Sequence, residues 1–188
     1  MTQDKLFKIV QISNHEALNL SLRTTLLNKS ATEPDAVSHL SHGQSAFHNK
    51  WLSKIDLHKS SDPDLKSLAA TIEKTANRLI SNSGIEGNLS MKHMWSMVSQ
   101  PGFHGDRHNH AAHLSGAYYV DVGSSGVESG GILQLYQSKD DEQPAYEVMP
   151  ENGMMVLFPG ALDHQVSVYN GEAPRVTISF NLVMDSKN

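Results

Sequence analysis

The spacing of apolar residues changes once along the chain, near Ser83, and divides the sequence into two parts. Before Ser83, Gly and Pro are scarce and apolar positions recur at intervals of three and four residues, the spacing of a helix that buries one face. After Ser83, apolar residues fall in short runs that are separated by turn sequences such as GSSG, PENG and NGEAP. This pattern predicts a helical N-terminal part and a β-rich C-terminal part.

The clearest helix is predicted to begin near Asp62. Asp62 can cap the helix, and Pro63 suits its first turn. Gly84 is a suitable terminator. One apolar stripe follows the helical spacing and consists of Leu65, Leu68, Ile72, Ala76 and Leu79.

A weaker helical pattern covers residues 14–28 and includes Ala17, Leu18, Leu22 and Leu26. The polar, His-rich segment between Ser30 and Ser61 predicts an irregular connection, with a short helix near Trp51.

The C-terminal part has the alternation that is typical of strands. The first run places Leu89, Met91, His93, Trp95 and Met97 on one side of a strand. Many short strands with turns between them favour an antiparallel sandwich or barrel. We therefore predict a mainly β (α+β) jelly roll, with N-terminal helices packed on one sheet. Residues 1–188 would form a single domain, with 1–84 as helical and loop support and 85–185 as the core. The further strand-like runs are 114–121, 131–137, 154–158, 164–169 and 175–184.

Composition narrows the function. The 188 residues carry a formal net charge of −5 and contain no Cys. An acidic chain has no general attraction for nucleic acid or anionic lipid, so neither is expected as a partner. The absence of Cys excludes disulfides, thiolate zinc sites and iron–sulfur clusters. No secretory signal or membrane span is visible, so a cytoplasmic location is expected. A homodimer is compatible with the sequence, which specifies no oligomeric state.

Histidine is unusually frequent, with 11 residues, and carries the strongest chemical signal. His108 and His110 lie two positions apart just ahead of a predicted strand, so their side chains can point the same way. His164 opens a later strand and is the candidate third ligand. Three neutral imidazoles suit Fe(II), Zn(II), Ni(II) or Cu(II) and leave coordination positions open.

Two alternatives compete with this interpretation. With so many histidines, a pair spaced as His108 and His110 also arises by chance on a surface. In addition, His104 and Asp106 have the His-x-acid form of a 2-His-1-carboxylate site. The sequence leaves open whether this second pair replaces the first at the metal.

The order of motifs after Trp95 resembles the iron(II)- and 2-oxoglutarate-dependent oxygenases, in particular a bacterial and phage branch of that superfamily. The resemblance covers roughly the C-terminal half of the chain. It rests on Gly102, the HNH triplet 108–110, LSGAYY at 114–119, Pro150, Gly153, FP at 158–159, His164, Val166 and RVTISFN at 175–181.

The resemblance implies a double-stranded β-helix, an oxidoreductase activity, and Fe(II), 2-oxoglutarate and O2 as cofactor and cosubstrates. It implies that His108, His110 and His164 bind the iron and are the catalytic residues. It also implies that Arg175 binds the distal carboxylate of 2-oxoglutarate, with help from Tyr119, Ser115 and Thr177. The wider superfamily has His-x-Asp or His-x-Glu, so a three-His site carries one less negative charge.

The implied reaction is hydroxylation of a substrate C–H bond with release of succinate and CO2. The substrate, a small molecule or a peptide, is not specified by the sequence. Asn109 and Gln134 are candidate polar groups near it, and residues 30–61 and 139–143 are candidate rim segments. Two alternatives remain: a cupin-type metal enzyme that needs no 2-oxoglutarate, and a non-catalytic jelly-roll sensor of a metal or small ligand.

Overall fold

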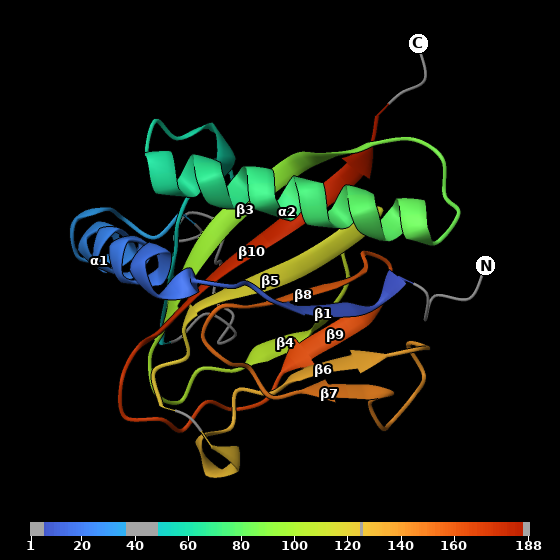
Figure 1. Cartoon of the computed structure of the whole chain (residues 1–188). Coiled ribbons are helices and arrows are strands. Elements are labelled where there is room, and N and C mark those ends of the chain that lie inside the picture. Colours follow the sequence, from blue (N-terminus) through green and yellow to red (C-terminus); the bar gives the residue numbers. More distant parts are fainter. Residues whose placement is uncertain (1–5, 37–48, 125, 186–188) are drawn as a thin grey trace.

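The computed structural model describes residues 6–36, 49–124 and 126–185, and these form two antiparallel sheets and a layer of two helices (Figure 1). The larger sheet has six strands in the order β1-β8-β5-β10-β3-β2, and the smaller has four in the order β4-β9-β6-β7. The strands of the larger sheet are β1 (Lys8–Gln11), β2 (Lys50–Leu52), β3 (Leu89–Ser99), β5 (Leu114–Asp121), β8 (Met154–Pro159) and β10 (Arg175–Met184). Those of the smaller sheet are β4 (Gly105–His108), β6 (Leu133–Tyr136), β7 (Tyr146–Val148) and β9 (Asp163–Val166).

The two helices lie on the outer face of the larger sheet (Figure 1). Helix α2 (Pro63–Asn82) begins where predicted, because the Asp62 side chain accepts hydrogen bonds from the backbone N–H groups of Asp64 and Leu65. Helix α1 (His15–Thr32) extends four residues beyond the predicted end. Two one-turn 3-10 helices, Leu57–Lys59 and Val127–Ser129, complete the described elements.

The residues that the structure describes form two hydrophobic cores, one on each face of the larger sheet. The first lies between the helices and the larger sheet and contains the apolar stripe of α2 together with Tyr118, Ile178 and Phe180. The second lies between the two sheets and includes Tyr119, Leu135 and Phe158. Successive residues of a strand point to opposite faces, so the neighbours Tyr118 and Tyr119 belong to different cores.

The jelly-roll prediction is confirmed, and the structure differs from the sequence-based expectations at three places. Trp51 itself lies in strand β2, because it pairs with Val98 at the edge of the larger sheet, and the short helix expected near it lies at Leu57–Lys59. The N-terminal part also contributes β1, which pairs with β8, so it supplies strands as well as helices and loops. The third difference concerns β3.

Strand β3 does not keep one set of residues on one face. Its pairing with β10 shifts between His93 and Met91, which leaves Lys92 as an extra residue. As a result Leu89 and Met91 pack in the helix-side core, whereas Trp95 and Met97 face the space between the sheets. The predicted connection at residues 30–61 is described only in part, since residues 37–48 lie outside the described ranges.

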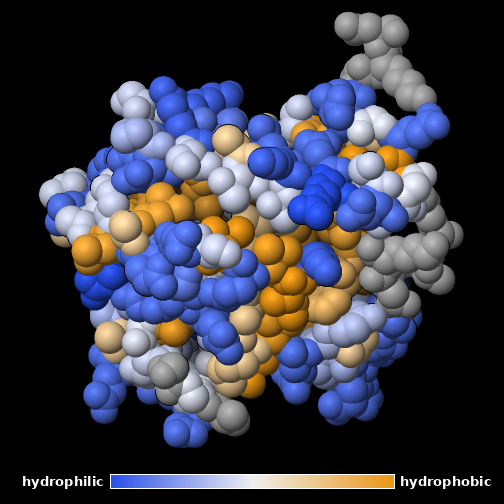
Figure 2. Space-filling model, in the orientation of Figure 1, coloured by the Kyte–Doolittle hydropathy of each residue, from blue (hydrophilic) through white to orange (hydrophobic). Residues whose placement is uncertain are grey.

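On the face shown in Figure 2, hydrophobic residues gather in a band across the middle of a largely hydrophilic surface. Exposed apolar residues include Ile9 on β1 and Leu20 on α1. No helix in the described part of the chain is long and apolar enough to cross a membrane.

Candidate metal and cosubstrate site

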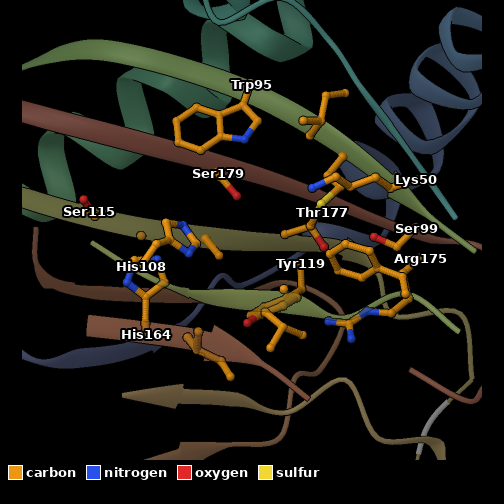
Figure 3. A pocket seen from close by; sticks show the side chains of 18 of the residues that line it. Lys50, Trp95, Ser99, His108, Ser115, Tyr119, His164, Arg175, Thr177 and Ser179 are labelled. Carbon is orange, nitrogen blue, oxygen red and sulfur yellow. The ribbon is translucent and has the colours of Figure 1, made fainter. Parts of the chain in front are cut away.

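A cavity of about 390 Å³ lies between the two sheets, with three imidazoles at one end and a guanidinium at the other (Figure 3). His108 from β4, His110 just after it and His164 from β9 face this cavity. His108 and His164 are directly opposite each other in the β4–β9 ladder. The short polar strand β4, which the sequence pattern did not predict, therefore brings the first pair to the third histidine.

The three imidazoles converge. Their ring centroids are 4.4 to 5.0 Å apart, and one ligand nitrogen from each lies within 4.8 Å of the others. Within the described ranges, these are the residues that form such a group. His104 and Asp106 instead face each other, with 3.5 Å between the imidazole Nε2 and a carboxylate oxygen, and both side chains are at least half exposed. The structure therefore does not favour the alternative His-x-Asp pair.

Backbone carbonyls orient two of the three rings. The Nδ1 of His108 lies 2.7 Å from the carbonyl oxygen of Asp106, and the Nδ1 of His164 lies 3.0 Å from that of Leu162. A carbonyl oxygen only accepts, so each Nδ1 carries the hydrogen and each Nε2 keeps its lone pair. Such bonds to the second ring nitrogen are typical of metal-binding histidines.

Burial favours the neutral, ligating form of two of the rings. Burial, with a smaller contribution from His108, lowers the pKa of His110 to about 4 and that of His164 to about 3. Neutral imidazoles with fixed tautomers are the donor set that Fe(II) and similar metals accept, so the residues present fit an iron site.

Arg175 is a buried cation that faces the cavity. Its side chain is 4% exposed, and one Nη donates to the carbonyl oxygen of Gly131 at 2.8 Å. Its guanidinium carbon lies 5.7 Å from the ring centre of Tyr119 and 5.2 Å from that of Tyr169. Burial lowers the pKa of Arg175. In the part of the chain that the structure describes, no carboxylate lies within ion-pair distance of Arg175.

Gly131 makes room for this guanidinium. Its φ is +67°, and a Cβ at this position would clash with an Arg175 Nη. A buried cation without a carboxylate is costly unless an anionic ligand accompanies it. The arrangement therefore favours an anion in the cavity.

The other residues predicted to bind 2-oxoglutarate lie at different ends of the cavity. Tyr119 and Thr177 are buried, line the cavity and stand opposite each other in the β5–β10 ladder. Ser115 lies at the imidazole end, and its hydroxyl donates to Asn181 Oδ1 at 2.7 Å (Figure 3). The geometry does not favour a contact of Ser115 with the same carboxylate as Arg175, because Ser115 lies four positions from Tyr119 along β5, toward the imidazoles.

The polar candidates Asn109 and Gln134 do not line the cavity. Asn109 donates to Asp163 Oδ1 at 2.7 Å, and Gln134 donates to Glu147 Oε1 at 2.6 Å. Of the two rim candidates, 139–143 also supplies no lining residue, and 30–61 supplies Lys50 and Leu52.

Lys50 and Tyr169 are features of the site that the sequence did not indicate, and Asp106 lines the cavity although the sequence suggested it only as a metal ligand. Lys50 lies in the segment predicted to be an irregular connection, and nothing in its local pattern distinguishes it from a surface lysine.

Behind the imidazoles lies a polar cluster, here called the outer clamp, formed by Arg107, Asn109 and Asp163. Each is a chain neighbour of a candidate ligand. Arg107 Nε lies 3.4 Å from Asp163 Oδ2, and Asn109 donates to the other oxygen of the same carboxylate. Arg107 also donates to the carbonyl oxygens of Ser138 and Asp141, both at 2.6 Å, and stacks 3.6 Å above the ring centre of Tyr136.

Comparisons with known proteins agree with this geometry. A family model of 2OG-Fe(II) oxygenases matches residues 93–181. That segment carries all three imidazoles, Arg175, Tyr119, Ser115 and Thr177. No curated protein sequence matches the chain.

Solved structures share the fold at low sequence identity. The chain resembles a prolyl-4-hydroxylase of Pseudomonas putida with a TM-score of 0.71 and 14% identity, over 96% of this chain and 93% of that one. It resembles a prolyl hydroxylase of Trichoplax adhaerens, solved with a peptide fragment, with a TM-score of 0.69 and 15% identity, over 94% of this chain and 84% of that one. It also resembles HygX of Streptomyces hygroscopicus, solved with nickel and 2-oxoglutarate, with a TM-score of 0.65 and 12% identity, over 96% of this chain and 84% of that one.

Residues 93–181, just under half of the chain, match the 2OG-Fe(II) oxygenases, oxidoreductases that use Fe(II), 2-oxoglutarate and O2, and the shared fold and the three convergent imidazoles agree with that match.

Proposed function

We propose that this protein hydroxylates a C–H bond of an organic substrate while 2-oxoglutarate is converted to succinate and CO2. The observation that carries the proposal is the pairing of three convergent imidazoles with a buried guanidinium at the opposite end of one cavity. A cupin-type enzyme without 2-oxoglutarate would have no need of Arg175 there.

In this proposal His108, His110 and His164 hold Fe(II) through their cavity-facing ring nitrogens. Bound Fe(II) would supply the redox chemistry by which O2 oxidises both 2-oxoglutarate and the substrate C–H bond. One oxygen atom enters the substrate as a hydroxyl group and the other enters succinate, so substrate, O2 and 2-oxoglutarate give hydroxylated product, succinate and CO2.

In this proposal the protein's own residues bind and orient 2-oxoglutarate and keep water away from it. The guanidinium of Arg175 can bind a carboxylate through two parallel N–H groups while another N–H stays on Gly131. The hydroxyl of Thr177 and the phenol of Tyr119 can add hydrogen bonds on the same side. Apolar side chains on the smaller sheet, among them Leu133 and Val166, line the cavity and limit the access of water to the bound cosubstrate.

Succinate release tests the proposal. The purified protein with Fe(II), ascorbate, O2 and 2-oxoglutarate should release succinate slowly without a substrate and faster with the correct one. Release should disappear without Fe(II) and in the His164→Ala variant. A protein that binds Fe(II) but neither binds 2-oxoglutarate in calorimetry nor releases succinate would contradict the proposal and favour the cupin or sensor alternatives.

A further inference from the structure

The residues of the larger sheet that line the cavity form two parallel rows, one on β10 and β5 and the other on β2 and β3. The space over each row is called a slot here, and the proposed cosubstrate contacts only the first row. In the larger sheet Ser99 stands opposite Arg175 on one side and Lys50 on the other, so the two cations occupy the same level of the sheet. The slot over β10 and β5 runs from Arg175 to the imidazoles. The second slot lies over β2 and β3, and runs from Lys50 to Trp95 beside the imidazoles (Figure 3).

The second slot is apolar along its length and charged at one end. Leu52, Met97 and Trp95 form its floor, and Phe103 faces it from the other wall. Lys50 Nζ lies 5.2 Å from the ring centre of Phe103.

Charged residues of both signs lie at the Lys50 end of the second slot. Asp106, from strand β4, lines the cavity and has a side chain that is 60% exposed, so it lies at the mouth. Its carboxylate also faces His104. Asp35 and Asp106 both attract the ammonium of Lys50, yet burial outweighs them and lowers the pKa of Lys50. A further anionic group from a ligand would therefore stabilise the charged lysine.

We propose that this second slot binds a free α-amino acid with an apolar side chain, which is the substrate class of the oxygenase. The ligand carboxylate would lie at Lys50, its ammonium at Asp106, and its side chain along Leu52 and Met97 toward Trp95. This inference rests on the function proposed above. A free amino acid carries one anionic, one cationic and one apolar group, and these match Lys50, Asp106 and the apolar floor of the slot.

The length of the slot agrees with such a ligand. Ser99 and Trp95 are four positions apart along β3, which corresponds to about 13 Å. The Lys50 side chain extends along the slot (Figure 3), so the remaining length suits a side chain of about the size of leucine or methionine. A carbon near the end of that side chain would then lie beside the imidazoles, where the hydroxylation takes place.

Calorimetry with chemically matched probes tests this assignment. Valine, leucine, isoleucine and methionine are titrated into protein that holds Ni(II) and 2-oxoglutarate, and so are N-acetyl-leucine and leucinamide, in which one charge is removed. We expect at least one amino acid to bind, and leucine to bind at least tenfold more tightly than either blocked form. The amino acid that binds should also accelerate succinate release from the Fe(II) protein in air.

Two variants and a control locate the binding groups. Lys50→Met and Asp106→Asn should each weaken amino-acid binding at least tenfold, while the affinity for 2-oxoglutarate changes less than threefold. Lys54→Met, an exposed lysine of the same segment outside the cavity, should leave amino-acid binding unchanged. This control separates the local charge of Lys50 from a general loss of positive charge.

The outcomes separate the two proposals. If the protein binds 2-oxoglutarate but none of the four amino acids, or if Lys50→Met leaves their binding intact, the second slot has another role and the proposed oxygenase reaction stands. If Lys50→Met weakens 2-oxoglutarate instead, Lys50 belongs to the cosubstrate slot and the inference is wrong. If the protein does not bind 2-oxoglutarate at all, the proposed function fails and this inference fails with it.

Discussion

At the scale of single residues, the site depends on which polar atoms already have partners in the fold. Backbone carbonyls occupy the Nδ1 atoms of His108 and His164, so only the opposite nitrogens remain for a metal. Arg175 uses one N–H on Gly131 and keeps others toward the cavity. The sequence predicted the candidate ligands from their spacing. It could not predict the carbonyl bonds, because these depend on where distant backbone segments end up.

Replacement of the buried guanidinium should remove most of the affinity for 2-oxoglutarate. We expect Arg175→Met, which keeps an unbranched apolar stem but removes the guanidinium, to weaken binding by roughly 2–5 kcal/mol, the usual cost of truncating one partner of a buried, hydrogen-bonded charge pair. Calorimetry with Ni(II)-loaded protein measures this loss. Metal affinity should change little, because Arg175 lies at the far end of the cavity from the imidazoles.

The Arg175 variant also needs a folding control, because the guanidinium lies between Tyr119 and Tyr169. Thermal unfolding of metal-free Arg175→Met shows whether the fold persists. Equal 2-oxoglutarate affinity in a folded variant and the wild type would show that the anion binds elsewhere.

At the scale of secondary-structure elements, irregular pairing determines which side chains reach the cavity. The extra residue at Lys92 turns the following part of β3 so that Trp95 and Met97 face the site. A second irregularity between Gly105 and His108 leaves strand β4 with few regular pairs to β9. A period of two in the sequence predicts strands but not these shifts, because a bulge depends on the partner strand. The same limitation explains why the alternation places Leu89 and Met91 on the same side of the strand as Trp95 and Met97, whereas the structure separates them.

The outer clamp compensates for the weak pairing of β4, and its removal should loosen the metal site. We expect Asp163→Ala to weaken Co(II) or Ni(II) binding about 10- to 100-fold, the range seen when groups that support metal ligands are removed. The physical reason is that Asp163 joins the chain neighbours of all three imidazoles. The visible absorption of Co(II)-loaded protein should also change, which a general loss of stability would not cause.

Arg23→Gln is the matched control for Asp163→Ala. It breaks an ion pair with Asp121 on the helix-covered side of the larger sheet, away from the imidazoles. Its metal affinity should equal that of the wild type. If Asp163→Ala also keeps wild-type affinity, the clamp stabilises the strand without positioning the ligands.

Helix α2 offers a test of the layer beneath the site. Asp62→Ala should cost about 1 kcal/mol of unfolding free energy, because two backbone N–H groups lose their acceptor. Asp62→Asn keeps an acceptor oxygen and should cost less. Urea denaturation measures both changes, and the affinity for 2-oxoglutarate should stay the same in each variant. A loss of 2-oxoglutarate binding in Asp62→Ala would show that the helix layer is coupled to the cavity.

At the scale of the whole molecule, the N-terminal third completes the larger sheet from both edges. Strand β1 pairs with β8 and strand β2 with β3, while helices α1 and α2 cover the outer face (Figure 1). The sequence predicted the helices, because a buried stripe at helical spacing is a strong local signal. It missed β1 and β2, since edge strands of three or four residues carry too few positions to show a period. Lys50 was missed for the same reason, although it lies in the cavity only because β2 is a strand.

The metal-free fold should lose stability as the pH falls, because the site holds two imidazoles neutral. The folded pKa values of His110 and His164, about 4 and about 3, lie below the usual value of about 6.5 in an unfolded chain. As the pH falls below 6.5, the unfolded chain therefore binds protons that the folded protein does not, and unfolding becomes more favourable. The loss should grow until the pH reaches the folded pKa values, and at pH 4.5 it should be on the order of 2 kcal/mol for each histidine. Urea denaturation at pH 7 and pH 4.5 measures it. His164→Gln removes one of the two groups, so its stability should fall by about 2 kcal/mol less over the same interval. An equal fall in the variant and the wild type would show that His164 accepts a proton in the folded state as readily as in the unfolded one, which the buried position of this ring argues against.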